Sequence, residues 1–376
     1  MAGLRPGATI GMLGGGQLGR MLAMAAARLG FVTVTYDPAT DCPAAQTASR
    51  HMAAAWDDAA ALEAFAGQCD VVTYEFENVP VEAVACIART VPVWPDARAL
   101  ETARDRLAEK TFLRGLGIAT APFLPVDDEA GLRRALGDPL VAHGAILKTC
   151  RMGYDGKGQV PVAAGVRDAD PAAIWQAVGG VACILEGFVD FALEISVVAA
   201  RGAGGAFRAY DPACNCHREG ILRQSVVPAP IASPVAESAI SIARTIMDGL
   251  DYRGVMGVEC FVTRQGDVLV NEIAPRVHNS GHWTEAACLV SQFEQHVRAI
   301  SGLPLGDPAR HSDCVMENLI GGDVDRVPAL LRDGRGLVHL YGKAQTRPGR
   351  KMGHVTWLSP LGQGSGEGPS PGTARP

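Results

Sequence analysis

Residues 8–95 alternate between apolar, strand-like runs and helix-like stretches that are joined by short loops. The expected elements, in chain order, are a strand at 8–13, a helix at 17–29, a strand at 31–36, a helix at 58–65, a strand at 70–75 and a helix at 81–89. Regular alternation of this kind is typical of a parallel sheet with helices on its faces. The N-terminal part of the chain is therefore predicted to be a doubly wound, Rossmann-like α/β domain.

Length and composition restrict the rest of the chain to ordinary globular domains. The 376 residues suffice for about two or three domains, and 48% are hydrophobic and 20% charged. The net charge of −6 gives no general attraction to nucleic acid or to an anionic membrane, so neither is expected as a partner. No signal-peptide pattern is present, and no stretch approaches the ~20 apolar residues of a membrane helix. We expect a soluble, cytoplasmic protein.

The ten cysteines are scattered without a repeating spacing. The segment Cys214-Asn215-Cys216-His217 invites a zinc interpretation. A structural zinc site needs four ligands, usually as two spaced pairs, and no second pair follows. We expect ordinary reduced thiols.

Beyond residue 100 the alternation gives way to a different order of elements. The expected elements are a charged helix at 102–116, strands at 145–148, 184–186 and 193–200, and an amphipathic helix at 292–300. A last small module spans 310–360. Residues 361–376 are mostly Gly, Ser and Pro, which predicts a disordered tail.

Two glutamates, Glu259 and Glu272, lie in apolar runs that flank a short glycine-containing turn, which is a hairpin signal. Centring the turn on Gln265-Gly266 gives three cross-strand pairs: Val262 with Leu269, Phe261 with Val270, and Glu259 with Glu272. Like charges directly opposed on a sheet are ~5 Å apart and destabilising. A cation between them, or a proton on one of them, removes the repulsion, and Mg²⁺ suits two carboxylates together with substrate phosphates. In another register the two glutamates would be separate and solvated.

The segment Gly14-Gly15-Gly16-Gln17-Leu18-Gly19 follows the first strand and opens the first helix. Glycines at such a turn let backbone N–H groups approach an anionic ligand. Asp37 ends the second strand about 20 residues later, as in dinucleotide-binding folds. The segment alone fits a nicotinamide dehydrogenase or a tight turn that binds nothing.

A glycine-rich loop follows Lys148, the last residue of an expected strand. Glycines at 153, 156 and 158 give exposed amides that can fold over phosphates, and Lys148 and Lys157 supply positive charge. Taken alone, this loop is equally a flexible hairpin tip. Downstream, the segment that follows Glu186 can offer backbone amide and carbonyl groups to a base edge, with a carboxylate such as Glu194 for ribose hydroxyls, although the pattern is common on surfaces.

Two polar clusters complete the candidate chemistry. Directly after Glu272, the segment 275–282 carries Arg276, His278 and His282, which suits a small anion. Near the C-terminus a positive cluster in an otherwise acidic chain suggests a phosphate partner, and it consists of Lys343, Arg347, Arg350 and Lys351.

With these residues in hand, the chain resembles the N5-carboxyaminoimidazole ribonucleotide synthetases, ATP-grasp enzymes of bacterial and fungal purine synthesis. The resemblance runs from Ile10 to about Trp357. It rests on GGGQLGRM at 14–21, YEFENVP at 74–80, GYDGKGQ at 153–159, HREGILR at 217–223, NEIAPRVHNSGH at 271–282 and RPGRKMGH at 347–354.

The resemblance implies an α/β ATP-grasp fold behind the N-terminal domain, with a small C-terminal module. We expect an N-terminal domain at 1–100, a small lid subdomain with the flap at 101–185, the large subdomain plus C-terminal module at 186–360, and the tail at 361–376. It also implies a homodimer.

The resemblance further implies ATP, Mg²⁺ and bicarbonate, and it assigns residues to each. The nucleotide contacts would be Arg106, Lys148, Gly153, Tyr154, Asp155, Gly156, Lys157, Gly158, Gln159, Glu186, Gly187, Phe188, Val189, Glu194, His217, Asn271 and Glu272. The Mg²⁺ ligands would be Glu259 and Glu272. The pocket for aminoimidazole ribonucleotide would be Gln17, Glu75, Tyr154, Asp155, Lys343, Arg350 and Lys351. The chemical steps would fall to Asp155, Lys157, Arg276 and Lys351.

The implied reaction joins ATP, bicarbonate and 5-aminoimidazole ribonucleotide into N5-carboxyaminoimidazole ribonucleotide, ADP and phosphate through carboxyphosphate. Rival interpretations are a formate-dependent glycinamide ribonucleotide transformylase, a biotin carboxylase, a dehydrogenase and a non-catalytic nucleotide sensor. The chain departs from common patterns at three positions: Ala274 two residues after the second glutamate, Cys150 before the flap and Cys214 near His217.

Overall fold

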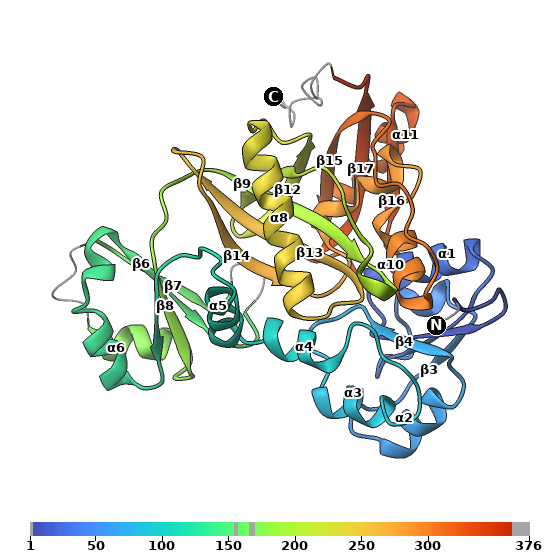
Figure 1. Ribbon diagram of the computed structural model, residues 1–376, viewed down its shortest axis with the longest axis horizontal. Helices are drawn as coiled ribbons and strands as arrows, with labels where there is room; N and C mark the ends of the chain where they lie inside the picture. The colour runs from blue at the N-terminus through green and yellow to red at the C-terminus, as the bar shows by residue number, and fades with distance from the viewer. Residues whose placement is uncertain (1–2, 154–156, 165–169, 363–376) are drawn as a thin grey trace.

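Three β-sheets organise the chain in the computed structural model, which describes residues 3–153, 157–164 and 170–362 (Figure 1). Of the expected disordered tail, 361–376, only the first two residues lie within the described part. In that part, no helix is both long and apolar enough to cross a bilayer.

The first sheet confirms the prediction for the N-terminal domain. Its four parallel strands have the order β3-β2-β1-β4, with β1 Thr9–Leu13, β2 Val32–Tyr36, β3 Arg50–Met52 and β4 Val71–Tyr74. The connecting elements are α1 Gln17–Arg28, η1 Ala44–Gln46, α2 Ala59–Ala66 and α3 Val81–Ile87. Ile10 and Met12 pack on the α1 side, while Leu13 packs with residues of α2 and α3. Burial on both faces is what a parallel sheet requires.

The second sheet is small and antiparallel, with the order β5-β8-β6-β7. Its strands are β5 Phe123–Val126, β6 Ala145–Thr149, β7 Gln159–Val162 and β8 Cys183–Gly187, and the helical elements around it are α6 Glu129–Ala135, η2 Pro139–His143 and α7 Pro171–Ala177.

Two helices lead from the first sheet to the second, α4 Ala97–Ala103 and α5 Arg106–Gly115. The prediction of a single helix at 102–116 was therefore wrong. Asp105 interrupts it, because its carboxylate accepts hydrogen bonds from the N–H groups of Leu107 (3.1 Å) and Ala108 (3.2 Å) and so begins a new helix.

The third sheet has nine strands, and β14-β13-β9-β11-β12-β15-β17-β16 is its order, with β10 paired to β9. The strands are β9 Phe191–Arg201, β10 Phe207–Ala209, β11 Ala213–Arg218, β12 Ile221–Val227, β13 Gly254–Thr263, β14 Val268–Ala274, β15 Asp313–Ile320, β16 Gly336–Leu340 and β17 Lys351–Ser359. The accompanying helical elements are η3 Ala203–Gly205, α8 Ser233–Gly249, η4 Asn279–Gly281, α9 Thr284–Ala287, α10 Gln292–Ser301, η5 Gly321–Arg326 and α11 Val327–Asp333.

Helices α8 and α10 cover opposite faces of this large sheet. Alternate residues of β9 separate accordingly: Ile195 and Val197 pack with residues of α8, and Val198 packs with residues of α10. The C-terminal strands β15–β17 extend the same sheet, so the C-terminal module shares a layer with the preceding domain (Figure 1).

The hairpin of β13 and β14 pairs Glu259 with Glu272, as predicted, but the other two predicted pairs were wrong. Phe261 pairs with Leu269, and Val262 pairs with Val268. The turn therefore centres on Gln265. A β-bulge between Glu259 and Cys260 shifts the register by one residue, which leaves Asn271 as the extra residue of β14.

Gly11 permits close packing on strand β1 of the N-terminal domain. A Cβ atom at this position would lie 2.7 Å from Cys69 Sγ, 2.8 Å from Phe65 Cζ and 2.9 Å from Val72 Cγ2. The middle of β1 therefore accepts only glycine without movement of its neighbours.

Gly11→Ala should lower the free energy of unfolding by about 1–3 kcal/mol, because overpacking forces neighbouring side chains and backbone to shift. Gly115→Ala is the matched control, since a Cβ there meets nothing within 4 Å; it should leave stability equal or slightly higher. Urea unfolding of both variants measures the difference. Equal unfolding of Gly11→Ala and the wild type would show that this packing is not tight.

Candidate functional site

Glu259 and Glu272 form the centre of the site, on the same face of β13 and β14. Their side chains are 16% and 40% exposed. Burial, followed by the charge of Glu272, raises the pKa of Glu259. Burial also acts to raise the pKa of Glu272, but the charge of Arg106 and its hydrogen bond outweigh burial and lower it. Glu272 is thus a stable anion, whereas Glu259 lacks a positively charged partner as strong as Arg106.

The donor set around these carboxylates fits Mg²⁺. All the groups are oxygen donors, which this hard ion prefers. Asn271, the bulged residue that precedes Glu272 on β14, adds a buried Oδ1 atom that has no hydrogen-bond partner among the described residues. Buried polar atoms are rarely left unpaired, so the orphan oxygen is consistent with a cation ligand.

Arg106 joins the carboxylate pair to the glycine-rich loop. Its Nη1 atom lies 3.1 Å from Glu272 Oε2, and its Nη2 atom donates to the carbonyl of Gly153 at 3.3 Å. The loop connects β6 to β7, and its far end is held by the hydrogen bond from Thr149 N–H to the carbonyl of Gly158 (2.8 Å). Of the predicted loop residues, Lys157, Gly158 and Gln159 are exposed, whereas Tyr154, Asp155 and Gly156 lie outside the described residues.

Glu186 is buried between two lysines. Its Oε2 accepts from Lys148 Nζ at 2.7 Å, and its Oε1 lies 3.4 Å from Lys110 Nζ. Burial acts to raise the pKa of Glu186, but the two positive charges outweigh it and lower the pKa. Sequence reasoning missed Lys110, because a lysine within a charged helix gives no sign that it is buried.

The chain passes from the buried interior to the solvent-exposed surface directly after Glu186 and Gly187. Gly187 is buried and donates its N–H to the carbonyl of Pro122 (2.8 Å), whereas the side chain of Phe188 is 57% exposed and Val189 is half-buried. Exposed apolar groups beside a buried carboxylate suit the planar face of a base.

Glu194 and His217 lie on the neighbouring strands β9 and β11. His217 Nδ1 lies 2.6 Å from Glu194 Oε2. Burial acts to lower the pKa of His217, but the contact with Glu194 and the charge of Glu259 outweigh it and raise the pKa. The Glu194 carboxylate thus favours the protonated form of His217 next to the carboxylate pair.

The two histidines of segment 275–282 have different surroundings. His278 Nε2 lies 3.3 Å from Glu259 Oε1, and burial followed by the charge of Arg276 lowers the pKa of His278 to about 3. His278 is therefore neutral. His282 instead packs against the rings of Phe293 and His354, at centroid distances of 5.4 and 5.0 Å.

Arg276 Nη2 lies 2.7 Å from Glu77 Oε2, which connects the site to the N-terminal domain. Glu77 belongs to the segment YEFENVP, yet sequence reasoning did not single it out. Its position relative to Arg276 depends on the docking of two domains, and no local pattern reports that.

The glycine turn of the N-terminal domain is occupied by carboxylates of the protein itself. Gly15 N–H donates to Asp37 Oδ2 (2.8 Å), Gly16 N–H to Glu75 Oε1 (2.8 Å) and Gly19 N–H to Glu75 Oε2 (3.3 Å). A pyrophosphate at this turn would meet two acids instead of free amides. The dehydrogenase interpretation is therefore wrong for this turn, which Glu75 and Asp37 hold beside Gln17.

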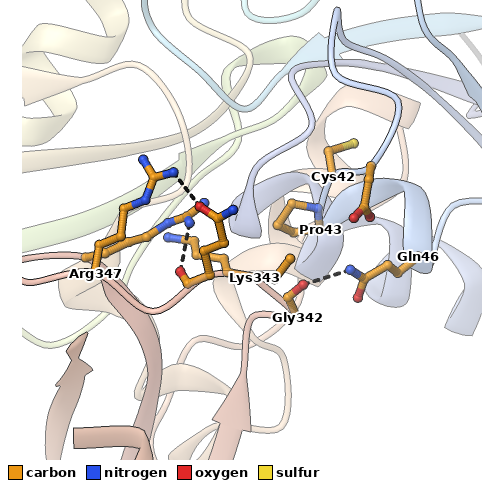
Figure 2. Close-up of a pocket in the computed structure, with 10 residues that line it drawn as sticks. Cys42, Pro43, Gln46, Gly342, Lys343 and Arg347 are labelled. Atoms are coloured by element: carbon orange, nitrogen blue, oxygen red, sulfur yellow. Dashed lines mark hydrogen bonds between the residues drawn. The ribbon is translucent and has the colours of Figure 1, made fainter. Parts of the chain in front are cut away.

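A cavity of about 300 Å³ lies between the N-terminal domain and the C-terminal strands (Figure 2). Its lining includes three basic residues, Lys343, Arg347 and Arg350. Gln46 Nε2 donates to the carbonyl of Gly342 at 2.7 Å, and Arg350 Nη1 to the carbonyl of Gln345 at 2.9 Å. Lys343 Nζ donates to the carbonyl of Lys351 at 2.6 Å. Three of the four residues of the predicted basic cluster thus line one cavity, whereas Lys351 does not, and Gln46 is a lining residue that the sequence did not reveal.

Family models match three successive parts of the chain. They are the ribonucleotide synthetase preATP-grasp domain at residues 7–104, the ATP-grasp domain at 111–293 and the phosphoribosylaminoimidazole carboxylase C-terminal domain at 314–361. The first match spans the parallel sheet, the second spans the small sheet and strands β9–β14 of the large one, and the third spans strands β15–β17. They confirm the ATP-grasp fold.

Known proteins of one family resemble the whole chain. The N5-carboxyaminoimidazole ribonucleotide synthase of Brucella melitensis is 54% identical, over 95% of this chain and 98% of its own. A crystal structure of an ADP complex of an N5-carboxyaminoimidazole ribonucleotide synthetase has a TM-score of 0.90 and 37% identity, covering 95% of this chain and 94% of the other. The Aspergillus clavatus synthase, in complex with ADP and 5-aminoimidazole ribonucleotide, has a TM-score of 0.86 and 29% identity, covering 94% of each chain. The chain belongs to the N5-carboxyaminoimidazole ribonucleotide synthase family of ATP-grasp enzymes in purine biosynthesis.

Proposed function

We propose that this chain carries out the reaction of its family, the ATP-dependent carboxylation of 5-aminoimidazole ribonucleotide to N5-carboxyaminoimidazole ribonucleotide, with bicarbonate as the carbon source and ADP and phosphate as products. The observation that carries the proposal is the opposed pair of Glu259 and Glu272, with Arg106 on one of them. Such a pair serves a metal–nucleotide complex, which a dehydrogenase does not need. Family membership favours this substrate over glycinamide ribonucleotide or biotin.

We assign the nucleotide to the space between the small sheet and the large sheet. Arg106, Lys148 and the loop 153–159 would contact its phosphates, because they supply positive charge and backbone N–H groups. Lys148 is paired with Glu186 in the described structure, so ATP phosphates would take over part of that pairing. The base would lie along the segment from Glu186 to Val189, and the remaining contacts would be Glu194, His217 and Asn271.

Mg²⁺ would be held by Glu259 and Glu272, with Asn271 Oδ1 as a further oxygen donor. When bound, the ion would neutralise charge on the phosphates and on the two carboxylates. Arg106 would keep Glu272 ionised and oriented before the ion arrives.

The ribonucleotide would bind in the cavity between the domains, with its phosphate on the basic cluster. Lys343 and Arg350 line this cavity, and Lys351 follows Arg350 directly in the sequence. Gln17, Glu75, Tyr154 and Asp155 would face the base and ribose, with Glu75 fixing the turn that carries Gln17.

The chemistry would proceed by attack of a bicarbonate oxygen on the γ-phosphorus, with ADP leaving and carboxyphosphate forming. Arg276 would hold the anion, and Lys157 and Lys351 would neutralise charge during phosphoryl transfer. Carboxyphosphate would break to CO₂ and phosphate in a closed site that excludes water. The exocyclic amine would then bond to the CO₂ carbon, and its proton would pass to the released phosphate or to Asp155.

The remaining expectations enter as parts of the same proposal. The boundaries 1–100, 101–185 and 186–360 would separate substrate binding, the nucleotide lid and the metal-binding body. We also propose a homodimer in the cytoplasm.

ADP release, with bicarbonate and the ribonucleotide omitted in turn, tests the proposal. Release that requires the ribonucleotide and increases with bicarbonate is the expected result. Release that ignores the ribonucleotide, or that responds to formate, would overturn the substrate assignment. No ADP under any condition would indicate a nucleotide sensor.

Glu272→Gln should lower kcat by at least about 100-fold, because it removes a carboxylate from the metal and leaves Arg106 without its ion pair. High Mg²⁺ concentration should restore part of the lost kcat. The measurement is the rate of ADP release as a function of Mg²⁺ concentration. Glu129→Gln, an exposed glutamate on α6, is the matched control. A wild-type Mg²⁺ dependence in Glu272→Gln would contradict the metal site.

Arg350→Ala should raise KM for the ribonucleotide by roughly 10-fold or more, since a charge-assisted hydrogen bond to phosphate is lost. KM for ATP should stay near the wild-type value. Arg335→Ala, which removes an exposed guanidinium that pairs with Asp333, controls for the loss of charge. Should KM for ATP change instead, the phosphate assignment is wrong.

A further inference from the structure

A row of hydrogen-bonded polar side chains crosses the interior of the large sheet and ends at the candidate metal site. Ser225 Oγ donates to Asn215 Oδ1 at 2.8 Å, and Asn215 Nδ2 donates to Ser196 Oγ at 2.9 Å. Ser196 Oγ donates to Ser280 Oγ at 2.6 Å, and Ser280 Oγ lies 2.8 Å from His278 Nδ1. All five residues are buried. We call this series the relay.

The relay lies between the carboxylates of the candidate site and the hydrophobic core on the same face of the large sheet. Ser196 stands on β9 directly opposite Glu259 on β13, and the next inward-facing residues of β9, Val198 and Ala200, belong to the hydrophobic core. Asn215 stands opposite both Ser225 and Glu194 on its neighbouring strands. Four polar side chains among buried apolar neighbours are unfavourable unless every one is paired.

The donors of the relay point in one direction. The Asn215 amide nitrogen can only donate, so Ser196 accepts from it and gives its own proton to Ser280. The Ser280 backbone N–H donates to His278 Nδ1 at 3.4 Å, which makes Nδ1 an acceptor, and an acceptor there takes the Ser280 hydroxyl, 2.8 Å away, as its second donor. With two donors on Nδ1, the proton of the neutral imidazole belongs on Nε2, which is the atom 3.3 Å from Glu259 Oε1.

The backbone of His278 is fixed independently of the ring. Its N–H donates to Gln292 Oε1 at 2.8 Å, and its carbonyl accepts from Gln292 Nε2 at 2.7 Å. These bonds set the position of the residue but say nothing about the tautomer. Which ring nitrogen of His278 carries the proton therefore depends on the relay.

We propose that Ser225, Asn215, Ser196 and Ser280 are positioning residues that hold His278 in the Nε2–H tautomer with this N–H directed at the Glu259 carboxylate. They act on the reaction only through His278 and Glu259. An N–H aimed at one oxygen of Glu259 leaves the remaining lone pairs of that carboxylate oriented for a cation, as outer-shell partners do for metal ligands. The inference rests on the proposed function, because it assigns Glu259 to the metal.

Asn215→Asp tests the direction of the relay with almost no change in shape. The substitution replaces the donor Nδ2 with an acceptor, so Ser196 must donate to residue 215 and can no longer donate to Ser280. The proton order then reverses, and His278 should carry its proton on Nδ1. Long-range ¹H–¹⁵N correlation spectra of the full chain with ¹⁵N-labelled histidine report the tautomer, and His278→Gln assigns the signal among the nine histidines.

The kinetic expectation separates positioning from mere stability. Asn215→Asp should lower kcat by about 10–100-fold, with KM for ATP near the wild-type value. Asn318→Asp is the matched control: Asn318 is fully buried on β15 of the same sheet and donates to the Leu222 carbonyl outside the relay. It should lose stability to a similar degree and keep kcat.

Ser196→Ala provides a second test that does not introduce a buried acid. This substitution interrupts the relay, so it should also reduce the population of the Nε2–H tautomer and kcat. Ser301→Ala is the control, because the buried Ser301 hydroxyl donates to a carbonyl of its own helix, and this variant should change neither quantity. An unchanged His278 tautomer in both relay variants would overturn the inference, as would losses of kcat no larger than those of the controls. The spectra need no turnover, so they decide the tautomer even if the wild type shows no ribonucleotide-dependent ADP release, which is the failure specific to the proposed function.

Discussion

The repulsion between two opposed carboxylates, Glu259 and Glu272, determines how the residues around them are arranged. Like charges that face each other on a sheet are destabilising, and here each one is compensated differently. Arg106 stabilises the charge of Glu272, whereas burial and Glu272 itself raise the pKa of Glu259. His278 is neutral, so its ring lies 3.3 Å from Glu259 without adding a full positive charge. A pair so arranged favours a divalent cation, because the cation removes a repulsion that the folded protein otherwise retains.

Helix α5 places both halves of the site. Arg106, at its start, reaches Glu272, and Glu109 one turn later accepts the backbone N–H of Ile273 at 2.5 Å. Lys110 donates to the carbonyl of Val270 at 3.3 Å and also lies beside Glu186 of the small sheet. The same helix thus contacts strand β14, which carries Glu272, and strand β8, which carries Glu186. Any movement of the small sheet relative to the large one would change these contacts together, which couples the position of Glu186 to the geometry of the carboxylate pair.

The sequence predicted those features that depend on local pattern. Alternating apolar runs were sufficient for the parallel N-terminal sheet, and the conjunction of short motifs was sufficient for the family. Features that depend on tertiary contacts were not predicted: the burial of Lys110, the ion pair of Arg276 with Glu77, and the addition of β15–β17 to the large sheet. The helix break at Asp105 was missed for a different reason, since an aspartate within a charged segment reads equally well as a helix surface residue or as an N-cap.

The pairing of Glu259 with Glu272 was predicted correctly from the hairpin turn, but the turn is not its cause. The turn by itself would place Glu259 opposite Asn271 and Glu272 on the other face, because side chains alternate along a strand. The bulge at Asn271 reverses that outcome, and contacts from elsewhere in the chain fix both of its sides. Before the bulge, Val270 accepts from Lys110 and donates its N–H to the carbonyl of Ala119 (2.9 Å); after it, Ile273 donates to Glu109. These partners are about 150 residues or more away in sequence, so helix α5 and the strand entry beside it, and not the hairpin turn, bring the two carboxylates face to face.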